Sequence, residues 1–222
     1  MTAMYIDRAA ISLKQQVIDR LRGAILDGSF SSGQKLVEKD LCAMLGISRT
    51  LLREALQHLE AEQLITNVPH KGPMVAVVDE AEARAIYQVR QALEGLAGEG
   101  FAQNASAEQM HALRQSIEYL ESEDVVSTTQ KLLGAKNRFY EALLKGCGNQ
   151  IVANVLTQLN NRITLLRRLS LAQTGRIQET RKELTAIADA LESRNSALAK
   201  QLCEEHVAKA AQIAMKRFVS GD

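Results

Sequence analysis

Proline placement divides this sequence into two unequal parts. Both prolines, Pro69 and Pro73, lie within one short stretch, and no proline follows Pro73 in the 222-residue chain. Proline disrupts helix interiors, whereas Ala, Leu, Glu, Gln and Arg favour them. The long proline-free part is rich in these helix formers. We therefore expect a mainly α protein whose only convincing sheet lies beside the prolines.

Downstream of Asp79, short breaks such as Asn104–Ser106 and Gly146–Asn149 separate long stretches of helical composition. Loops this short join antiparallel neighbours in helix bundles. The pattern predicts an all-α bundle of about six helices in residues 79–222. The expected helices cover residues 79–102, 106–121, 124–145, 150–172, 175–193 and 195–218.

Upstream of the prolines, three helical patterns follow one another. Apolar residues recur at helical spacing over residues 13–25, and Gly28 follows as a stop signal. A short helix over residues 38–45 ends at Gly46, and Ser48 then caps a third helix.

Apolar, β-branched stretches at residues 64–68 and 74–78 flank the prolines and predict a β-hairpin with an irregular tip, where Gly72 supplies backbone freedom. Helix, short helix, tight turn, helix and hairpin is the order of a winged helix-turn-helix. We assign residues 1–78 to this domain and residues 79–222 to the helical bundle.

The third helix carries the residues best suited to DNA. Arg49 and Arg53 are four residues apart, so both project from the face opposite the apolar Leu52 and Leu56. An arginine fork matches guanine O6 and N7 in the major groove. The hydroxyls of Ser48 and Thr50 at the helix start suit phosphate, and His70, Lys71 and Gly72 at the hairpin tip suit the backbone or minor groove. The alternative is that the two arginines are only solvated, with Glu54 and Glu60 as neighbours.

Charge gives no independent sign of a nucleic-acid partner. The chain has 27 basic and 26 acidic side chains and a formal net charge of +1. A polyanion would therefore be met by local placement of charge and not by a global field.

Other function classes lack their motifs. We find no nucleophilic triad, no glycine-rich phosphate loop and no framed carboxylate pair, so we do not expect an enzyme. Cys42, Cys147 and Cys203 are far apart and odd in number, which excludes a disulfide framework or a zinc spacing. No apolar run is long enough for a membrane span, and residues 1–10 lack a secretory signal's apolar stretch. A cytoplasmic protein is expected.

Residues 46–56, Gly-Ile-Ser-Arg-Thr-Leu-Leu-Arg-Glu-Ala-Leu, closely resemble the DNA-binding domain of GntR-superfamily transcriptional regulators. The usual pattern there is Gly-Val-Ser-Arg-Thr-Pro-Val-Arg-Glu-Ala-Leu, so Leu51-Leu52 stands where Pro-Val is commoner. The resemblance covers residues 11–78, including Leu59, Leu64-Ile65 and Lys71-Gly72. It implies DNA contacts at Lys39, Arg49, Thr50, Arg53, His70, Lys71 and Gly72, with Ser48 touching DNA or capping the helix nearby.

The helical part resembles the FCD effector domain of the FadR branch of that superfamily. The residues that carry this resemblance are Val89–Glu94, Arg138–Leu143 and Gly148-Asn149. That family often holds a divalent metal with one Asp and three His. The corresponding positions here are Lys136, Tyr140, Leu184 and His206, of which only His206 is a ligand type.

We therefore expect no cofactor and no family-type metal. Glu183, beside Leu184, is expected to face about 100° around its helix and not to replace a ligand. His206 alone is expected to be a satisfied or half-exposed histidine.

An ammonium could stand where the family holds its metal cation. Lys136 and Tyr140 are four residues apart, so an ammonium and a hydroxyl can converge inside the bundle. The resemblance places Arg90 at the effector cavity, and its planar fork suits a carboxylate. Arg90, Lys136, Tyr140 and His206 are the predicted effector site, for a small carboxylate, a fatty-acyl or another apolar anion. Alternatively, Lys136 reaches solvent, Tyr140 fills core and Arg90 pairs with Glu94.

The basic run at residues 162–168 is interpreted as one packed helix whose arginines extend to solvent. Together these features predict a ligand-responsive, DNA-binding transcriptional regulator that acts as a repressor. A two-fold homodimer on a palindromic operator is expected, assembled largely through the helical domain. The competing hypothesis is a helical adaptor whose winged domain binds protein instead of DNA.

Overall fold

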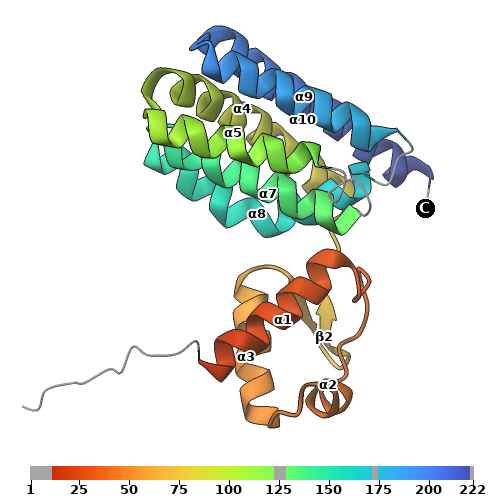
Figure 1. The fold of residues 1–222 in the computed structure, drawn as a ribbon. Coiled ribbons are helices and arrows are strands. Elements are labelled where there is room, and N and C mark those ends of the chain that lie inside the picture. The colour runs from red at the N-terminus through yellow and green to blue at the C-terminus, as the bar shows by residue number, and fades with distance from the viewer. Residues whose placement is uncertain (1–11, 123–128, 172–174, 221–222) are drawn as a thin grey trace, which may run out of the picture. The chain divides into compact units, whose positions relative to one another are not determined.

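The computed structural model describes residues 12–122, 129–171 and 175–220 (Figure 1). The chain divides into two compact units, Met1–Val77 and Val78–Asp222, each of which has its own core. The expected mainly α fold, with a small wing in the first unit and an all-helical second unit, is confirmed.

The first unit contains three helices before the hairpin in the described residues: α1 (Leu13–Asp27), α2 (Glu38–Leu45) and α3 (Arg49–Ala61). Gly28 and Gly46 end α1 and α2 in the left-handed conformation, with φ of 88° and 66°, which glycine adopts without a steric penalty. α1 and α3 are in contact, and each contributes buried apolar residues to this unit, such as Ile18 and Ile25 of α1 and Leu52 and Leu59 of α3. The outer face of α3 therefore lies opposite an apolar core.

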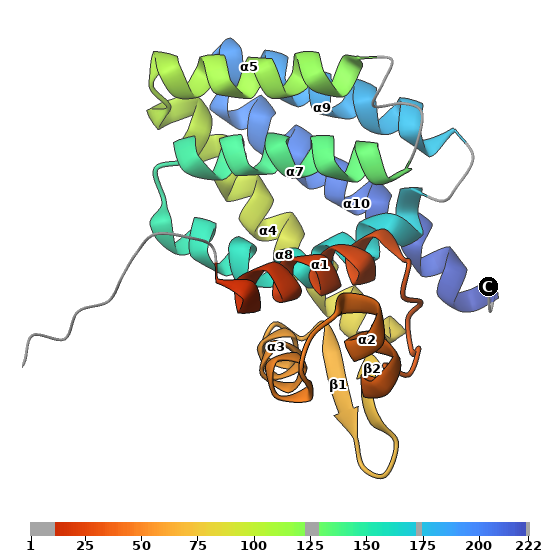
Figure 2. The ribbon, with the colours of Figure 1, turned by 60° about the horizontal axis from the view of Figure 1, so that its bottom comes forward.

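The hairpin consists of β1 (Ile65–Val68) and β2 (Gly72–Val75), which pair antiparallel (Figure 2). The second strand therefore begins earlier than the predicted 74–78, which was wrong in its bounds. The reason is the pairing of Val68 with Gly72, which leaves only residues 69–71 at the tip. A bridge from Lys35 to Met74 further fixes the register, and a prediction based on the hairpin alone misses it.

The second unit consists of long helices in the described residues. They are α4 (Glu80–Asn104), α5 (Ala107–Glu121), α7 (Thr129–Gly146), α8 (Gln150–Leu171), α9 (Arg176–Glu192) and α10 (Ser196–Ser220). These bounds follow the predicted breaks closely. The expected start of the third helix of this unit, at residue 124, lies outside the described residues.

The helices α4 and α10 run antiparallel and in close contact. A Cβ atom built on Gly98 would lie 2.7 Å from Cys203 Sγ and 3.1 Å from the Ala199 carbonyl oxygen, so only glycine fits there without a shift. The apolar core of the unit includes Phe101 and Phe139, both fully buried. The small residues at this contact bring the inner faces of α4 and α10 together, and these faces carry the polar groups described next.

Candidate functional site

The start of α3 is a capped helix end with exposed polar side chains. Ser48 has extended backbone angles and its hydroxyl accepts a hydrogen bond from the Leu51 backbone N–H at 3.3 Å, which caps the helix. Arg49, Thr50 and Arg53 are exposed on the outer face, whereas the inner face is buried. The division of faces predicted from spacing is therefore what the structure shows.

Arg53 is not simply solvated. Both carboxylate oxygens of Glu38, the first residue of α2, accept from its Nε at 3.0 and 3.1 Å, and this contact raises the pKa of Arg53. The neighbours expected from sequence have other partners. Glu54 pairs with Lys14 at 3.2 Å, and Glu60 accepts a hydrogen bond from the Asn67 backbone N–H at 3.3 Å. The Glu38 contact was missed because it joins residues 15 positions apart.

The hairpin tip projects the remaining predicted residues. His70 has φ of 63° and Gly72 has φ of 84°, so the tip turns through the left-handed region at both positions. The Lys71 backbone N–H donates to the Val68 carbonyl oxygen at 3.0 Å. His70 and Lys71 are exposed, Gly72 is half-buried, and Lys39 on α2 is exposed. All the predicted DNA-contact residues are thus at the surface of one unit, and their contact with DNA stays a prediction.

The predicted effector residues lie in the interior of the second unit. Arg90 on α4, Lys136 and Tyr140 on α7, and His206 on α10 are all buried, with 0%, 1%, 7% and 1% exposure. Lys136 does not reach solvent, so that alternative is wrong. Burial and the positive charge of Arg167 lower the pKa of Lys136 well below its usual value.

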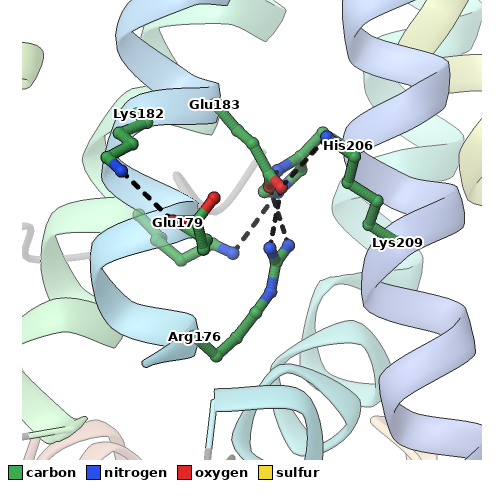
Figure 3. Close-up of polar contacts among 7 residues, drawn as sticks. Arg176, Glu179, Lys182, Glu183, His206 and Lys209 are labelled. Carbon is green, nitrogen blue, oxygen red and sulfur yellow. Dashed lines mark hydrogen bonds and ion pairs between the residues drawn. The ribbon is translucent and has the colours of Figure 1, made fainter. Parts of the chain in front are cut away.

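A chain of polar contacts joins Lys136 to α9. Lys136 Nζ lies 3.5 Å from His206 Nε2, and His206 Nδ1 lies 2.6 Å from a carboxylate oxygen of Glu183 (Figure 3). Because the Glu183 carboxylate accepts a hydrogen bond from Nδ1–H, the neutral imidazole presents its Nε2 lone pair to Lys136 Nζ. Glu183 was expected to face about 100° around its helix and not to replace a ligand; its side chain is nevertheless long enough to contact His206 on α10. His206 is a satisfied core histidine.

Glu183 is the common partner of several cations. Arg176 donates to both of its oxygens at 2.7 Å, and Lys209 approaches at 3.6 Å (Figure 3). Burial opposes ionisation of this carboxyl, but the hydrogen bonds from His206 and Arg176 outweigh it and hold its pKa at about 2. Glu183 is therefore ionised at neutral pH.

Arg90 is only partly satisfied. Its Nε donates to Glu94 at 2.8 Å, as the pairing alternative expected, and its guanidinium lies 5.3 Å from the centre of the Tyr87 ring. Its two terminal nitrogens and the Tyr140 hydroxyl are buried without a hydrogen-bond partner among the described residues. Buried polar groups are almost always paired, so these donors are unusual. An acceptor from outside the chain could satisfy the terminal nitrogens of Arg90.

The helix α8 adds cations that sequence reasoning misplaced. Arg162 and Arg167 are 8% and 2% exposed, so their predicted extension to solvent is wrong. Arg162 pairs with Glu82, and Arg167 donates to Asn137 at 2.8 Å with its guanidinium 4.1 Å from the Tyr140 ring centre. The side chain of Arg168 lies outside the described residues. Three apolar residues within the run made a snorkelling helix the simpler interpretation.

These donors do not suit a divalent metal. Among the described residues, no three His, Cys, Asp or Glu side chains come together in a way that could hold one. Leu184 is fully buried and offers no ligand atom, and His206 Nε2 already faces an ammonium. The side chains at these positions are therefore poor ligands for the family's metal, and its absence from this domain stays a prediction.

A winged helix-turn-helix with arginines on its outer face, in a chain with a separate all-helical domain, defines the class of DNA-binding transcriptional regulators. Residues 13–75 match the bacterial regulatory proteins of the gntR family, and residues 85–209 match the FCD domain. The chain therefore belongs to the gntR family of bacterial regulators and carries an FCD domain. It is a regulator and not an enzyme.

Similar proteins cover nearly the whole chain. It is 26% identical to the HTH-type transcriptional regulator YdhC of Bacillus subtilis over 187 residues, and this aligned region covers 84% of each chain. It is 26% identical to a probable D-xylose utilization operon repressor of Paenarthrobacter nicotinovorans, over 89% of this chain and 86% of that one. Escherichia coli McbR/YncC has the same fold, with a TM-score of 0.75 at 21% identity over 96% of this chain and 99% of that one. No helix in the described ranges combines the length and hydropathy that crossing a bilayer requires.

The buried histidine predicts a fold that loses stability in acid. Burial and the nearby Lys136 lower the pKa of His206 from 6.5 to about 4, so between these values the unfolded chain holds a proton that the folded chain does not. The free energy of unfolding is expected to fall as the pH drops from 6.5 to 4, by up to about 3 kcal/mol. Urea unfolding across this range measures it.

The variant His206→Gln is the matched comparison, because glutamine retains a donor and an acceptor and does not titrate. Its unfolding free energy is expected to change less over the same pH range. An equally steep acid limb in both proteins would contradict the assignment to His206.

Proposed function

We propose that this protein is a ligand-responsive repressor that binds a palindromic operator as a homodimer. Binding of a small anion inside the helical domain changes the affinity of the protein for DNA. The observation that carries the ligand part is the set of buried donors without acceptors on Arg90 and Tyr140, beside the buried Lys136. Relatives named as repressors, including GlaR of Escherichia coli at 25% identity, support the direction of control. Such a regulator acts in the cytoplasm, where bacterial DNA lies.

The DNA part of the proposal depends on the outer face of α3. Arg49 and Arg53 are exposed and lie one helical turn apart, the spacing that places both in one major groove. Thr50 and the backbone amides of the capped helix start are available for phosphate. Lys39, His70, Lys71 and Gly72 would add contacts on either side of that groove.

Replacing both arginines, Arg49→Ala with Arg53→Ala, is expected to reduce operator affinity at least 100-fold, since each guanine contact contributes about 1–3 kcal/mol. Fluorescence anisotropy at moderate salt, on an operator selected from randomised duplexes, measures it. A control, Arg84→Ala with Arg138→Ala, removes the same charge from the helical domain and should retain most of the affinity. Unchanged binding by the α3 variant would overturn the proposal. Salt-insensitive binding to a protein partner would instead favour the adaptor hypothesis.

The pairing of the buried carboxylates supports an anion site in the interior. The carboxylates of Glu94 and Glu183 already bind Arg90 Nε and the Arg176–His206 pair, respectively. Lys136 Nζ faces the His206 imidazole at 3.5 Å and not a carboxylate. A carboxylate could accept from the terminal nitrogens of Arg90, from Tyr140 and from Lys136. Charge-assisted bonds of this kind are the strong ones in a low-dielectric interior.

Lys136→Met tests the anion site. The variant should fold, because replacing a buried cation by an apolar side chain of similar length removes a desolvation cost. A panel of mono- and dicarboxylates and a medium-chain fatty acid is titrated, with thermal shift and operator release as readouts. Binding of the active anion is expected to weaken at least 10-fold.

The control for this test is Lys182→Met, since Lys182 is exposed and pairs with Glu179 on the surface of α9. It should leave the titration unchanged. If Lys136→Met also leaves affinity and operator release unchanged, Lys136 is not part of the site.

The homodimer is supported by an exposed apolar stripe on α4. Ala85, Val89, Ala92 and Leu96 are spaced by four, three and four residues and are all exposed, with Val89 at 41% and Leu96 at 42%. This is the spacing of a helix seam that pairs with another helix. A two-fold axis beside the stripe would place it against its own copy and let two α3 helices read two half-sites.

The variant Val89→Glu with Leu96→Glu is expected to convert the dimer to monomers in sedimentation-velocity experiments, because it would place four like charges at the interface. Gln115→Glu on the exposed side of α5 is the control and should remain dimeric. A charged-stripe variant that still sediments as a dimer would place the interface elsewhere.

A further inference from the structure

The contact between Glu38 and Arg53 raises a question that the DNA-binding function does not answer. A surface that must attract a polyanion keeps a carboxylate against one of its two proposed reading arginines. Glu38 is 28% exposed at the side chain and Arg53 is 65% exposed, so the arginine remains accessible while the carboxylate is partly covered. Exposed ion pairs contribute little stability, so the fold has little need of this one.

The geometry of the pair is specific. Both Glu38 oxygens bind the same nitrogen, Nε, at 3.0 and 3.1 Å. Within the described residues, the ion pair with Glu38 uses Nε alone and leaves the two terminal nitrogens of Arg53 unused. Those nitrogens are the ones that can bind guanine O6 and N7 together. The carboxylate thus binds the Nε side of the guanidinium and leaves the two terminal nitrogens for a ligand.

The surroundings of the pair also favour a base over a phosphate. Glu38, Arg53, Gln57 and Asn67 line a hollow of about 280 Å³ between α2, α3 and the hairpin, and Glu60 lies on the same wall. A phosphate placed beside Arg53 would therefore approach the negative charge of Glu38. A guanine edge carries acceptors but no net charge, so it avoids most of this repulsion.

We infer that Glu38 is a positioning residue for sequence recognition: it holds Arg53 in the orientation that reads a guanine and prevents it from acting as a phosphate clamp. This inference rests on the proposed base contact of Arg53. Glu38 itself contributes no favourable contact to DNA. It makes the protein more selective at the cost of non-specific affinity, which is how a repulsive group creates specificity.

Glu38→Gln separates this role from a structural one. Operators are first selected from a randomised duplex pool with the unmodified protein, and affinity is then measured on that operator and on a scrambled duplex of equal length. The variant is expected to lower the ratio of the two affinities 5- to 100-fold, the range of one lost guanine contact. Its affinity for the scrambled duplex should stay equal or rise. A freed Arg53 that binds phosphate should also steepen the salt dependence by about one charge per half-site.

Glu54→Gln is the matched control, because it removes one carboxylate from α3 that pairs with Lys14 and not with Arg53. It should leave the ratio of affinities unchanged. The double variant Glu38→Gln with Arg53→Ala should discriminate no worse than Arg53→Ala alone, since Glu38 acts only through Arg53.

The outcomes separate two failures. If Arg53→Ala does not lower discrimination, the proposed base contact is wrong. If Arg53→Ala lowers it but Glu38→Gln does not, or if Glu38→Gln weakens both duplexes equally, then Glu38 does not position Arg53 and this inference alone is overturned.

Discussion

Taking ionisable side chains out of water is the constraint around which the helical domain is built. Arg90, Lys136 and His206 are at most 1% exposed, yet they come from three different helices. Their compensating carboxylates, Glu94 and Glu183, lie on α4 and α9. Leaving one member of a buried ion pair without its partner costs about 3–5 kcal/mol. The arrangement of these helices is therefore tied to which charges are paired.

This coupling gives a physical basis for sensing. A bound anion that satisfies Arg90 and Tyr140 would stabilise those helix positions in which its partners converge, and so shift the population of conformations. Only the difference in affinity between two conformations can do this, and a coupling of about 1–3 kcal/mol suffices for useful control. The DNA-binding unit differs in kind. The side chains that we propose contact DNA are exposed on an apolar scaffold, so geometry and not burial governs them.

Much of the fold can be predicted because its boundaries are marked locally. Gly28, Gly46 and Ser106 end or begin helices through their own backbone or side-chain chemistry. The hairpin bounds could not be predicted, because the bridge from Lys35 helps to set the register. Periodicity identifies which elements form, whereas contacts distant in sequence decide where strands start.

The same distinction applies to the sites. Spacing alone places Arg49 and Arg53 on the outer face of α3, and resemblance to the family brings Lys136 and His206 together. Glu183 was considered only as a metal ligand and was set aside because of the direction of its Cβ, so its contact with His206 on α10 was not predicted. Glu38 and Arg167 were missed for related reasons: one is distant in sequence from its partner, and the other lies in a run whose amphipathic pattern suggested a solvated face.

The glycine contact between α4 and α10 has a mechanical consequence. At Gly98 the two helices approach so closely that even a methyl group would collide with Cys203. Close-packed surfaces of this kind cannot slide past each other by small, continuous steps. Arg90 and His206 lie on these two helices, which are therefore expected to move as one rigid body. A displacement of either side chain's helix would then tilt both helices together.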